Sequence, residues 1–206
     1  MIAVVDYRVG NLFSLRSSLK AIGAEAIVTS DPGEIRTAEK ILLPGVGAFA
    51  DAAAKLRESG LDRMLCEEAE RGKDILGICL GMQLLFERSY EYGEHAGLGL
   101  IPGDVVPMEG KLPSSLKIPH IGWNALHPRQ KHRLLKNVEE GDCVYFVHSF
   151  YADRCEESVL ATAEYGIEVT AAVARDNVMG CQFHPEKSGD VGLSILRAFC
   201  EKGTNT

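Results

Sequence analysis

The sequence predicts an α/β fold: a doubly wound, mostly parallel central sheet with helices on both faces, plus a smaller antiparallel sheet. Short apolar runs rich in β-branched residues alternate with segments of helical spacing in the amino-terminal part, which is the pattern of parallel β-α units. Short strand-like runs joined by tight turns follow in the carboxyl-terminal part and favour antiparallel pairing there. No repeat or linker divides the 206 residues, so we expect one domain over 1–206.

The amino-terminal elements are marked by apolar runs and by helix boundaries. Residues 2–5 are apolar throughout, which is typical of a strand covered on both faces. The next helix is expected to run from Asn11, a candidate N-cap, to Gly23, a helix stop. The same patterns predict strands at 26–29, 40–44 and 74–78, a turn at 32–33, and helices at 50–57, 61–71 and 80–88.

The carboxyl-terminal elements are shorter and more often interrupted by glycine and proline. The segment 119–124 holds the single tryptophan, Trp123, among proline, glycine and histidine neighbours. A lone tryptophan is more often part of a core, but these neighbours favour an exposed loop tip. The other expected elements are loops and short strands over 89–115, a strand at 143–148, antiparallel strands at 159–163, 168–175 and 178–183, and a helix over 188–203.

Composition narrows the class of partner. The formal net charge of −7, without a cluster of lysine and arginine, argues against nucleic acid and favours a small molecule or a protein. The apolar run that opens the chain is too short for a membrane span and lacks the basic flank of a signal peptide. The six cysteines show no paired spacing, so we expect a reducing, cytoplasmic setting and no membrane partner.

Cys79 lies where a predicted strand meets a predicted helix. Gly77 and Gly81 flank it and give the Gly-x-nucleophile-x-Gly pattern of a nucleophile elbow, with cysteine in place of serine. Without Cβ atoms at the two glycines, strand and helix can approach closely, and the helix N-terminus favours a thiolate. Free cysteines are often small buried apolar residues, so taken alone Cys79 leaves that alternative open.

A glycine-rich turn at 44–49 follows the third predicted strand. Glycines let backbone N–H groups point at a bound anion, and the helix that follows adds its dipole. Open α/β sheets bind their ligands at the carboxyl ends of the strands, so we expect an anion site here. A plain turn would give the same pattern.

His184 and Glu186 follow the last predicted strand. Side chains two residues apart share one face of an extended backbone. Glu186 could therefore hold the imidazole while His184 takes the proton of Cys79 and later gives it to a leaving amine. A surface loop with an incidental ion pair is the alternative. The histidines do not have the spacing of metal ligands, so we expect no metal and no other cofactor.

Two separated motifs resemble the class I glutamine amidotransferases of the triad type: Gly-Ile-Cys-Leu-Gly-Met-Gln at 77–83 and His-Pro-Glu at 184–186. Four further segments are similar to the glutaminase subunits of imidazole glycerol phosphate synthase, so that the resemblance spans essentially the whole chain. They are Pro-Gly-Val-Gly-Ala-Phe at 44–49, Pro-His-Ile-Gly-Trp-Asn at 119–124, Phe-Val-His-Ser at 146–149 and Gln-Phe-His-Pro-Glu-Lys-Ser at 182–188.

The resemblance implies hydrolysis of glutamine to glutamate and ammonia by a triad of Cys79, His184 and Glu186. Its other implications concern the oxyanion hole, the substrate and a partner protein. They are an oxyanion hole at Val46 and Leu80, substrate contacts at Gly47, Gln83, His148, Ser149 and Phe150, and a partner surface at Asn11, Trp123, Asn124, Tyr145 and Lys187.

The implied partner is a (β/α)8-barrel cyclase in a heterodimer. It would use ammonia delivered through a channel to make imidazole glycerol phosphate and an aminoimidazole carboxamide ribonucleotide in histidine biosynthesis. One position departs from the resemblance, because tyrosine is often found where Phe150 stands. A main-chain contact would not need the missing hydroxyl. At the partner surface, Trp123 and Tyr145 could instead be core aromatics and Lys187 a solvated chain end.

Two other functions stay open. The chain could be the glutaminase subunit of another synthase, such as the one that makes pyridoxal phosphate, although the segment 119–124 argues against it. It could also be a non-catalytic binding module on the same fold. The intact set of Cys79, His184 and Glu186 argues against a module that has lost its chemistry.

Overall fold

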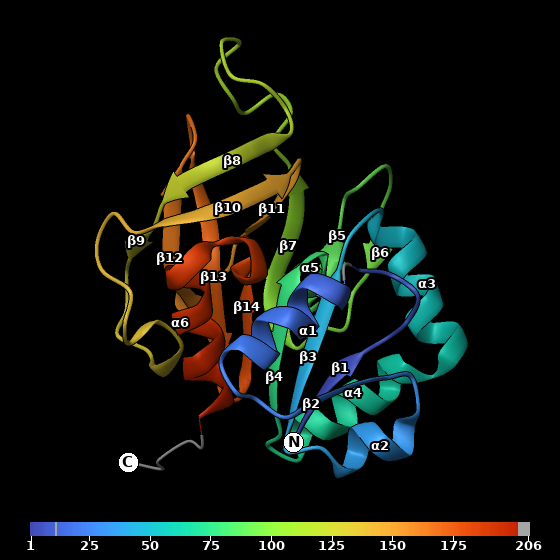
Figure 1. Ribbon diagram of the computed structural model, residues 1–206. Helices are drawn as coiled ribbons and strands as arrows, with labels where there is room; N and C mark the ends of the chain where they lie inside the picture. The colour runs from blue at the N-terminus through green and yellow to red at the C-terminus, as the bar shows by residue number, and fades with distance from the viewer. Residues whose placement is uncertain (11, 202–206) are drawn as a thin grey trace.

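The computed structural model describes residues 1–10 and 12–201. Within this part, the central sheet has eight strands in the order β2-β1-β3-β4-β14-β13-β12-β9 (Figure 1). The strands are β1 (Ile2–Val5), β2 (Ala26–Thr29), β3 (Lys40–Gly45), β4 (Asp74–Cys79), β9 (His127–Pro128), β12 (Val159–Glu164), β13 (Glu168–Arg175) and β14 (Val178–Cys181).

The central sheet joins a parallel half to an antiparallel half. Strands β1 to β4 pair in parallel, and β14 pairs in parallel with β4 but antiparallel with β13. Strand β14 therefore connects the two halves, and β4 lies at the centre of the sheet. The predicted doubly wound α/β fold class is confirmed.

Helices cover both faces of the sheet because the inner strands are apolar on both faces. Along β3, Ile41 and Leu43 pack into one core cluster and Leu42 into the other. Helices α2, α3 and α4 lie on the first face, and α1 and α6 lie on the second (Figure 1). The helices are α1 (Leu12–Ala21), α2 (Pro32–Thr37), α3 (Phe49–Ser59), α4 (Leu61–Glu70), α5 (Leu80–Leu84) and α6 (Gly189–Cys200), with single 3-10 turns at Arg133–Leu135, Glu156–Ser158 and Pro185–Lys187.

Two smaller sheets extend the carboxyl-terminal half. One has the order β11-β7-β5-β6, and because β5 pairs in parallel with β7 it is mixed rather than antiparallel as expected. The other is an antiparallel ribbon of β8 and β10, which crosses near the carboxyl ends of the central strands (Figure 1). Their strands are β5 (Phe86–Ser89), β6 (His95–Ala96), β7 (Ile101–Pro107), β8 (His120–Ala125), β10 (Cys143–His148) and β11 (Phe150–Asp153).

The helix expected over 80–88 is wrong beyond Leu84, because the chain turns into β5. The reason is tertiary. The backbone N–H of Leu98 donates to the carbonyl of Leu84 at 2.8 Å, and the N–H of Leu100 donates to the carbonyl of Leu85 at 2.8 Å. These distant partners take the carbonyls that a longer helix would use.

The predicted turn at 32–33 and the predicted loop at 119–124 are also wrong. Pro32 begins helix α2, where Asp31 caps the N-terminus by accepting from the backbone N–H of Glu34 at 2.9 Å. Residues 120–125 form β8, since their partner β10 supplies a ladder that the sequence alone does not reveal. At the end of the chain, β14 stops at Cys181 and α6 ends at Cys200, before the expected limits.

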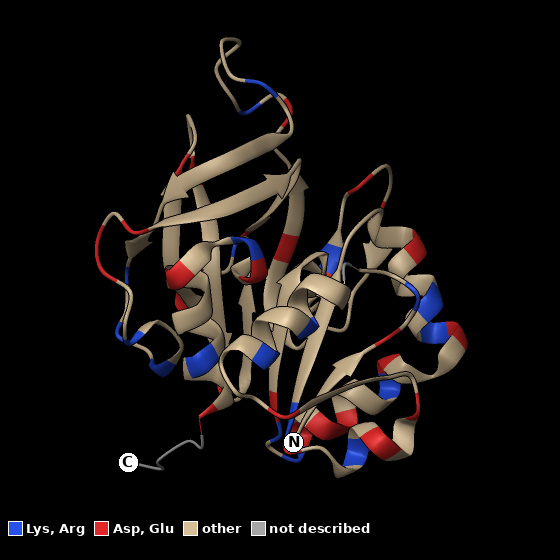
Figure 2. Cartoon of the chain, viewed as in Figure 1, with Lys and Arg blue, Asp and Glu red and all other residues tan. Residues whose placement is uncertain are grey.

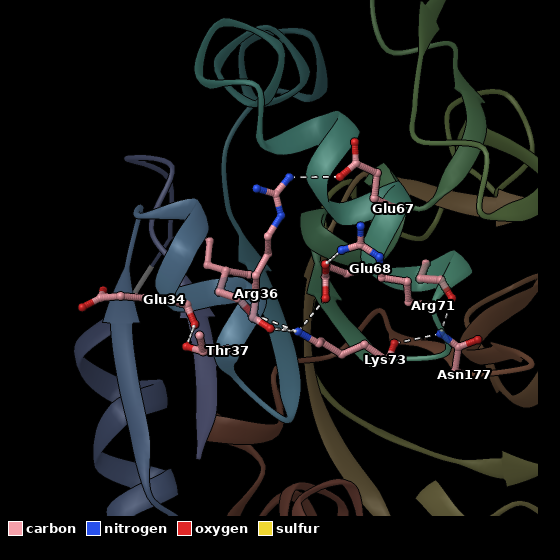
Figure 3. A network of polar contacts seen from close by, with 10 residues as sticks. Glu34, Arg36, Thr37, Glu67, Glu68, Arg71, Lys73 and Asn177 are labelled. Atoms are coloured by element: carbon pink, nitrogen blue, oxygen red, sulfur yellow. Dashed lines mark hydrogen bonds and ion pairs between the residues drawn. The ribbon is translucent and has the colours of Figure 1, made fainter.

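Charged residues are distributed unevenly between these elements. Neither β8 nor β10 carries a lysine, arginine, aspartate or glutamate, whereas the helices on the opposite side of the molecule carry many (Figure 2). Near the start of β4, Glu68 and Lys73 form a buried ion pair of 2.6 Å, and Lys73 also donates to the carbonyl of Arg36 (Figure 3). This network ties α2, α4 and β4 together.

Candidate active site

Cys79 occupies a strained turn at the carboxyl end of the central strand β4. Its backbone has φ 55° and ψ −113°, values that a residue with a Cβ atom rarely adopts. The strand ends at this residue and α5 begins at the next, so Cys79 lies at the edge of the sheet where parallel strands end. This is the geometry of a nucleophile elbow.

The flanking glycines are required by the close approach of three backbones. A Cβ atom on Gly81 would lie 1.7 Å from the carbonyl oxygen of Leu43 on β3. A Cβ atom on Gly77 would lie 2.6 Å from the carbonyl oxygen of Gly81. Any side chain at either position would push α5 away from the strands, and this would displace the cysteine.

His184 and Glu186 form a buried pair beside the cysteine. Nδ1 of His184 lies 2.8 Å from Oε1 of Glu186, and the two side chains are 3% and 4% exposed. Burial by itself would lower the pKa of His184, but the Cys79 sulfur and the Glu186 carboxylate outweigh it and raise the pKa to about 9. Within the described residues, Nε2 of His184 and Oε2 of Glu186 are buried without a partner. Nε2 is thus available for a proton from the sulfur or for a ligand.

The backbone of His184 is fixed from two sides. Its N–H donates to the carbonyl of Tyr145 on β10 at 2.9 Å, and its carbonyl accepts from Oγ of Ser188 at 2.6 Å. Ser188 Oγ in turn accepts from the N–H of Tyr145 at 2.9 Å. Helix α6 packs tightly behind this turn, because a Cβ atom on Gly192 would lie 1.9 Å from the carbonyl oxygen of Pro185.

A cavity of about 380 Å³ opens onto the cysteine and the histidine. Its volume suits a ligand of amino-acid size. All the oxyanion and substrate residues expected from the sequence line it together with Cys79 and His184, and Lys187 lies at its rim. The expected residues are Val46, Gly47, Leu80, Gln83, His148, Ser149 and Phe150. A second cavity of about 420 Å³ lies between α3, α4 and the segment 96–98 and contains none of these groups.

The two residues expected to form the oxyanion hole differ in freedom, although they lie on neighbouring segments, because Gly45 pairs with Cys79. Leu80 is buried and begins α5, so its backbone N–H has no acceptor within the helix. Val46 is 41% exposed, and Gly47 has φ 94° with open space around it. Before this loop, buried Tyr7 donates its hydroxyl to the carbonyl of Pro44 at 2.8 Å and holds the end of β3.

Glu91 and Tyr92 also line the cavity and were not expected from the sequence. The carboxylate of Glu91 accepts from the backbone N–H of Phe49, the first residue of α3. The ring of Tyr92 is 92% exposed and lies 6.1 Å from the ring of Phe150, edge to face. Both residues belong to a segment without periodicity, where the one available signal was an acidic residue among tyrosines and glycines.

Three of the expected partner-surface residues lie together. The rings of Trp123 and Tyr145 are 6.3 Å apart, and Nζ of Lys187 lies 5.6 Å from the centre of the Tyr145 ring. Trp123 is 57% exposed, so it is not a core residue. The amide of Asn124 instead donates to the carbonyl of Glu164 on the other face of β8. Asn11 lies outside the described residues.

Neither a metal site nor a membrane-spanning helix is found in the described part of the chain. No group of three or more histidine, cysteine, aspartate or glutamate side chains there could hold a metal ion. None of the helices described is both long enough and apolar enough to cross a bilayer.

Comparisons with known proteins agree with this geometry. Residues 3–202 match the sequence model of the family described as glutamine amidotransferase class-I. The chain is 49% identical over 205 residues to imidazole glycerol phosphate synthase subunit HisH of Wolinella succinogenes, covering 98% of this chain and 100% of the relative. It is 50% identical over 199 residues to the protein of the same name from Bacillus cereus, covering 97% and 93%.

A crystal structure of a glutamine amidotransferase has the same fold. It superposes with a TM-score of 0.75 at 20% identity, covering 96% of this chain and 99% of that one. The elbow, the buried histidine–glutamate pair and the match over 3–202 lead to one conclusion. The chain belongs to the class-I glutamine amidotransferase family.

Proposed function

We propose that the chain is the glutaminase subunit of an imidazole glycerol phosphate synthase, and that it hydrolyses glutamine with Cys79, His184 and Glu186. The observation that carries the proposal is that Nε2 of buried His184, beside Cys79, has no partner among the described residues, while Nδ1 is held by Glu186. The names of relatives about 50% identical over almost the whole chain support the choice of synthase.

The first half of the reaction transfers the glutamyl group to sulfur. His184 takes the Cys79 proton, and Sγ then attacks the side-chain amide carbon, so that a C–S bond forms and the carbonyl oxygen becomes an oxyanion. The backbone N–H groups of Leu80 and Val46 would stabilise this oxyanion. Nε2 of His184 protonates the amide nitrogen, the C–N bond breaks, and ammonia leaves a thioester behind.

The second half releases glutamate. Water gives a proton to the now neutral His184 and attacks the thioester carbon. A second tetrahedral adduct uses the same oxyanion donors, the C–S bond breaks, and the Cys79 sulfur recovers its proton from His184. Glu186 remains an anion throughout and stabilises each imidazolium that forms.

The cavity offers groups for the amino-acid end of glutamine. The half-buried carboxylate of Glu91 lines the cavity and is suited to the α-ammonium group, because the two groups carry opposite charges. The five residues that resemble family substrate contacts would hold the remainder, several through main-chain atoms. They are Gly47, Gln83, His148, Ser149 and Phe150.

The partner would be a (β/α)8-barrel cyclase in a heterodimer, which receives the ammonia through a channel. The uncharged β8–β10 ribbon, with exposed Trp123 beside Tyr145 and Lys187, supports a protein contact at this face (Figure 2). Asn11 and Asn124 would belong to the same interface. Six free cysteines support a cytoplasmic location, and the single-domain organisation over 1–206 is part of the proposal.

Glutamate release by the full chain, with and without the cyclase and its nucleotide ligand, tests this function. We expect weak activity alone and strong stimulation by the partner, because the exposed Val46 loop would be aligned on docking. Full activity without partner would contradict the coupling. No release in either state, together with no labelling of Cys79 by a glutamine-mimicking electrophile, would contradict the glutaminase and favour a non-catalytic module. Capture of a different synthase in a pull-down would contradict the cyclase.

A further inference from the structure

A buried chain of hydrogen bonds runs from strand β8 to the Cys79 sulfur. It passes through two histidines and two glutamines that lie on four different strands or helices or beside them. The first three links are Asn124 Nδ2 to His120 Nε2 at 3.3 Å, His120 Nδ1 to His148 Nε2 at 3.0 Å, and His148 Nδ1 to the Phe150 carbonyl at 2.8 Å. Nε2 of Gln83 donates to the same carbonyl at 3.1 Å and to Oε1 of Gln182 at 2.9 Å. The last link is Gln182 Nε2 to Cys79 Sγ at 3.7 Å.

Only one arrangement of protons satisfies every link. The Phe150 carbonyl can only accept, so Nδ1 of His148 must carry the proton and Nε2 must accept. Nδ1 of His120 therefore donates to that Nε2, and Nε2 of His120 accepts from the Asn124 amide. The orientation of this amide is set independently, because its oxygen accepts from the backbone N–H of Ala125 at 2.8 Å.

Burial makes this arrangement rigid. His120 is 2% exposed, His148 6%, Gln83 6% and Gln182 0%. Burial lowers the pKa of His120 to about 4 and the pKa of His148 to about 3, so both rings are neutral near pH 7. The Coulombic effects of His120 and His184 on His148 act in the same direction. If His120 or His148 gained a second proton, two hydrogen-bond donors would face each other.

These hydrogen bonds also determine which donors and acceptors in the cavity are free to bind a ligand. Both N–H bonds of the Gln83 amide are used, one by the Phe150 carbonyl and one by Gln182, so Gln83 can present only its Oε1 acceptor. Both ring nitrogens of His148 are used as well, so its side chain has no hydrogen bond to give. The amide of Gln182 directs an N–H at the sulfur.

We infer that His120 and Gln182 are positioning residues of the glutaminase site: His120 holds His148 and, through it, the Phe150 carbonyl that orients Gln83 at the substrate, and Gln182 orients Gln83 and stabilises the thiolate of Cys79. The inference rests on the proposed function for its substrate. The positioning roles themselves do not depend on glutamine as the substrate. They require only that Cys79 reacts as a thiolate and that Gln83 contacts the ligand as an acceptor.

A matched pair of substitutions separates hydrogen bonding from packing at His120. The ring of His120 stacks on Tyr165, with centres 4.0 Å apart, and on Phe146, with centres 4.8 Å apart. His120→Phe keeps an aromatic ring but removes the donor to His148. His120→Asn removes the ring but places an amide N–H near the position of Nδ1, and so serves as the conservative rescue.

The kinetic test uses the complex with the cyclase. We expect His120→Phe to raise KM for glutamine about 5- to 10-fold with a smaller change in kcat, because one buried acceptor is left unsatisfied. His120→Asn should stay within about 2-fold of the wild type, since the donor is retained. An Asn variant that is impaired as much as the Phe variant, or a Phe variant with unchanged KM, would overturn the role of His120.

The chemical test uses the full chain without glutamine. Gln182→Met keeps the volume but removes both the donor to sulfur and the acceptor for Gln83. Iodoacetamide should then alkylate Cys79 about 3- to 10-fold more slowly at pH 7, as followed by mass spectrometry of the peptide that contains Cys79. An unchanged alkylation rate in a variant with a native melting profile would overturn the role of Gln182. This readout remains valid if glutamine is not the substrate, so the two proposals can fail separately.

Discussion

Strands β3 and β4 have polar groups at both ends, and these groups are paired at one end but not all paired at the other. At the amino-terminal end, Nζ of Lys40 lies 2.9 Å from the carboxylate of Asp74, and Arg133 pairs with the same carboxylate. At the carboxyl-terminal end, Nε2 of His184 and Oε2 of Glu186 are buried without partners in the described part of the chain. The side chains of Lys40, His184 and Glu186 are 8%, 3% and 4% exposed, yet only the amino-terminal end pairs all of its named groups.

Under the proposed function, the carboxyl end serves chemistry and the amino end serves stability. A buried polar group without a partner costs about 1–3 kcal/mol of stability, so it is retained where a reaction uses it. Substitutions at the carboxyl end should therefore remove activity with little loss of stability. Substitutions at the amino end should lower stability and leave the activity of the folded protein unchanged. The following predictions test this contrast.

Cys79→Ala should produce the largest effect on activity. Without the sulfur no thioester can form, so partner-stimulated glutamate release should fall by at least about 10³-fold. The melting temperature should stay close to that of the wild type, because two hydrogen bonds of the sulfur are long, 3.7 Å from Nε2 of Gln182 and 4.0 Å to the Val147 carbonyl. Cys66→Ala, which removes a thiol on α4 outside the site cavity, is the control and should keep full activity. Residual activity above one-tenth would rule out a nucleophilic role.

Glu186→Gln should come next. The amide oxygen can still accept from Nδ1 of His184, but the negative charge that stabilises the imidazolium is lost. We expect kcat to fall about 10²- to 10⁴-fold with KM little changed, measured with the partner present. Above the raised pKa of His184, where the imidazole is neutral, the thermal unfolding curve should not move to lower temperature. If the variant lost stability but kept its activity, Glu186 would have a structural role like that of the charged residues at the amino-terminal end of the strands.

Glu68→Gln should show the reverse pattern. Its side chain is 3% exposed and pairs with Lys73 at 2.6 Å and with Arg71 at 2.5 Å (Figure 3). Removing its charge leaves Lys73 without its buried counter-ion, so unfolding in urea should reveal a loss of about 2–3 kcal/mol. Glutaminase activity per folded molecule should be unchanged.

The neighbouring residue provides the matched control. Glu67 pairs with Arg36 at 3.0 Å, but each side chain is 47% exposed. Glu67→Gln should cost less than about 1 kcal/mol, because exposed pairs are screened by water. If the two glutamates cost the same, burial would not account for the difference between them.

The smallest effects should appear in the dependence of stability on pH. Burial tends to raise the pKa of Glu68, but Lys73 and Arg71 outweigh it and lower the pKa below its ordinary value of 4.5. This carboxylate therefore adds stability above pH 4.5, which is lost as the pH falls through the lowered pKa. Urea unfolding across this range should show a shallower acid limb for Glu68→Gln than for the wild type.

At the carboxyl end of β4, the dependence of stability on pH has the opposite sign. The pKa of His184 is raised to about 9 from 6.5, so its imidazolium stabilises the fold below pH 6.5, and this contribution disappears as the pH rises through 9. We expect the free energy of unfolding to fall over this interval. His184→Gln should remove that slope. An unchanged slope would show that another group titrates there.

Much of the site was predictable because it depends on short-range geometry. The elbow at Cys79 needs Gly77 and Gly81 within two residues on either side, since a side chain there would strike backbone 2.6 Å and 1.7 Å away. The pairing of His184 with Glu186 needs only their separation by one residue. Steric requirements of this kind leave a pattern in the sequence.

Tertiary structure decided the features that need distant partners. Helix α5 stops at Leu84 because Leu98 and Leu100 take the carbonyls of Leu84 and Leu85. Glu91 reaches the cavity because the start of α3 binds its carboxylate.

Distant pairing also decides which residues of the β8–β10 ribbon are buried. Trp123 is exposed, whereas His120, three residues away on β8, is buried, because β8 pairs with β10 and turns alternate residues to opposite faces. The amino-acid sequence by itself determined the turn at Cys79, the pairing of His184 with Glu186 and the sheet that carries them. Which polar groups would meet across the chain was decided only by packing, since hydrogen bonds between residues far apart leave no local pattern.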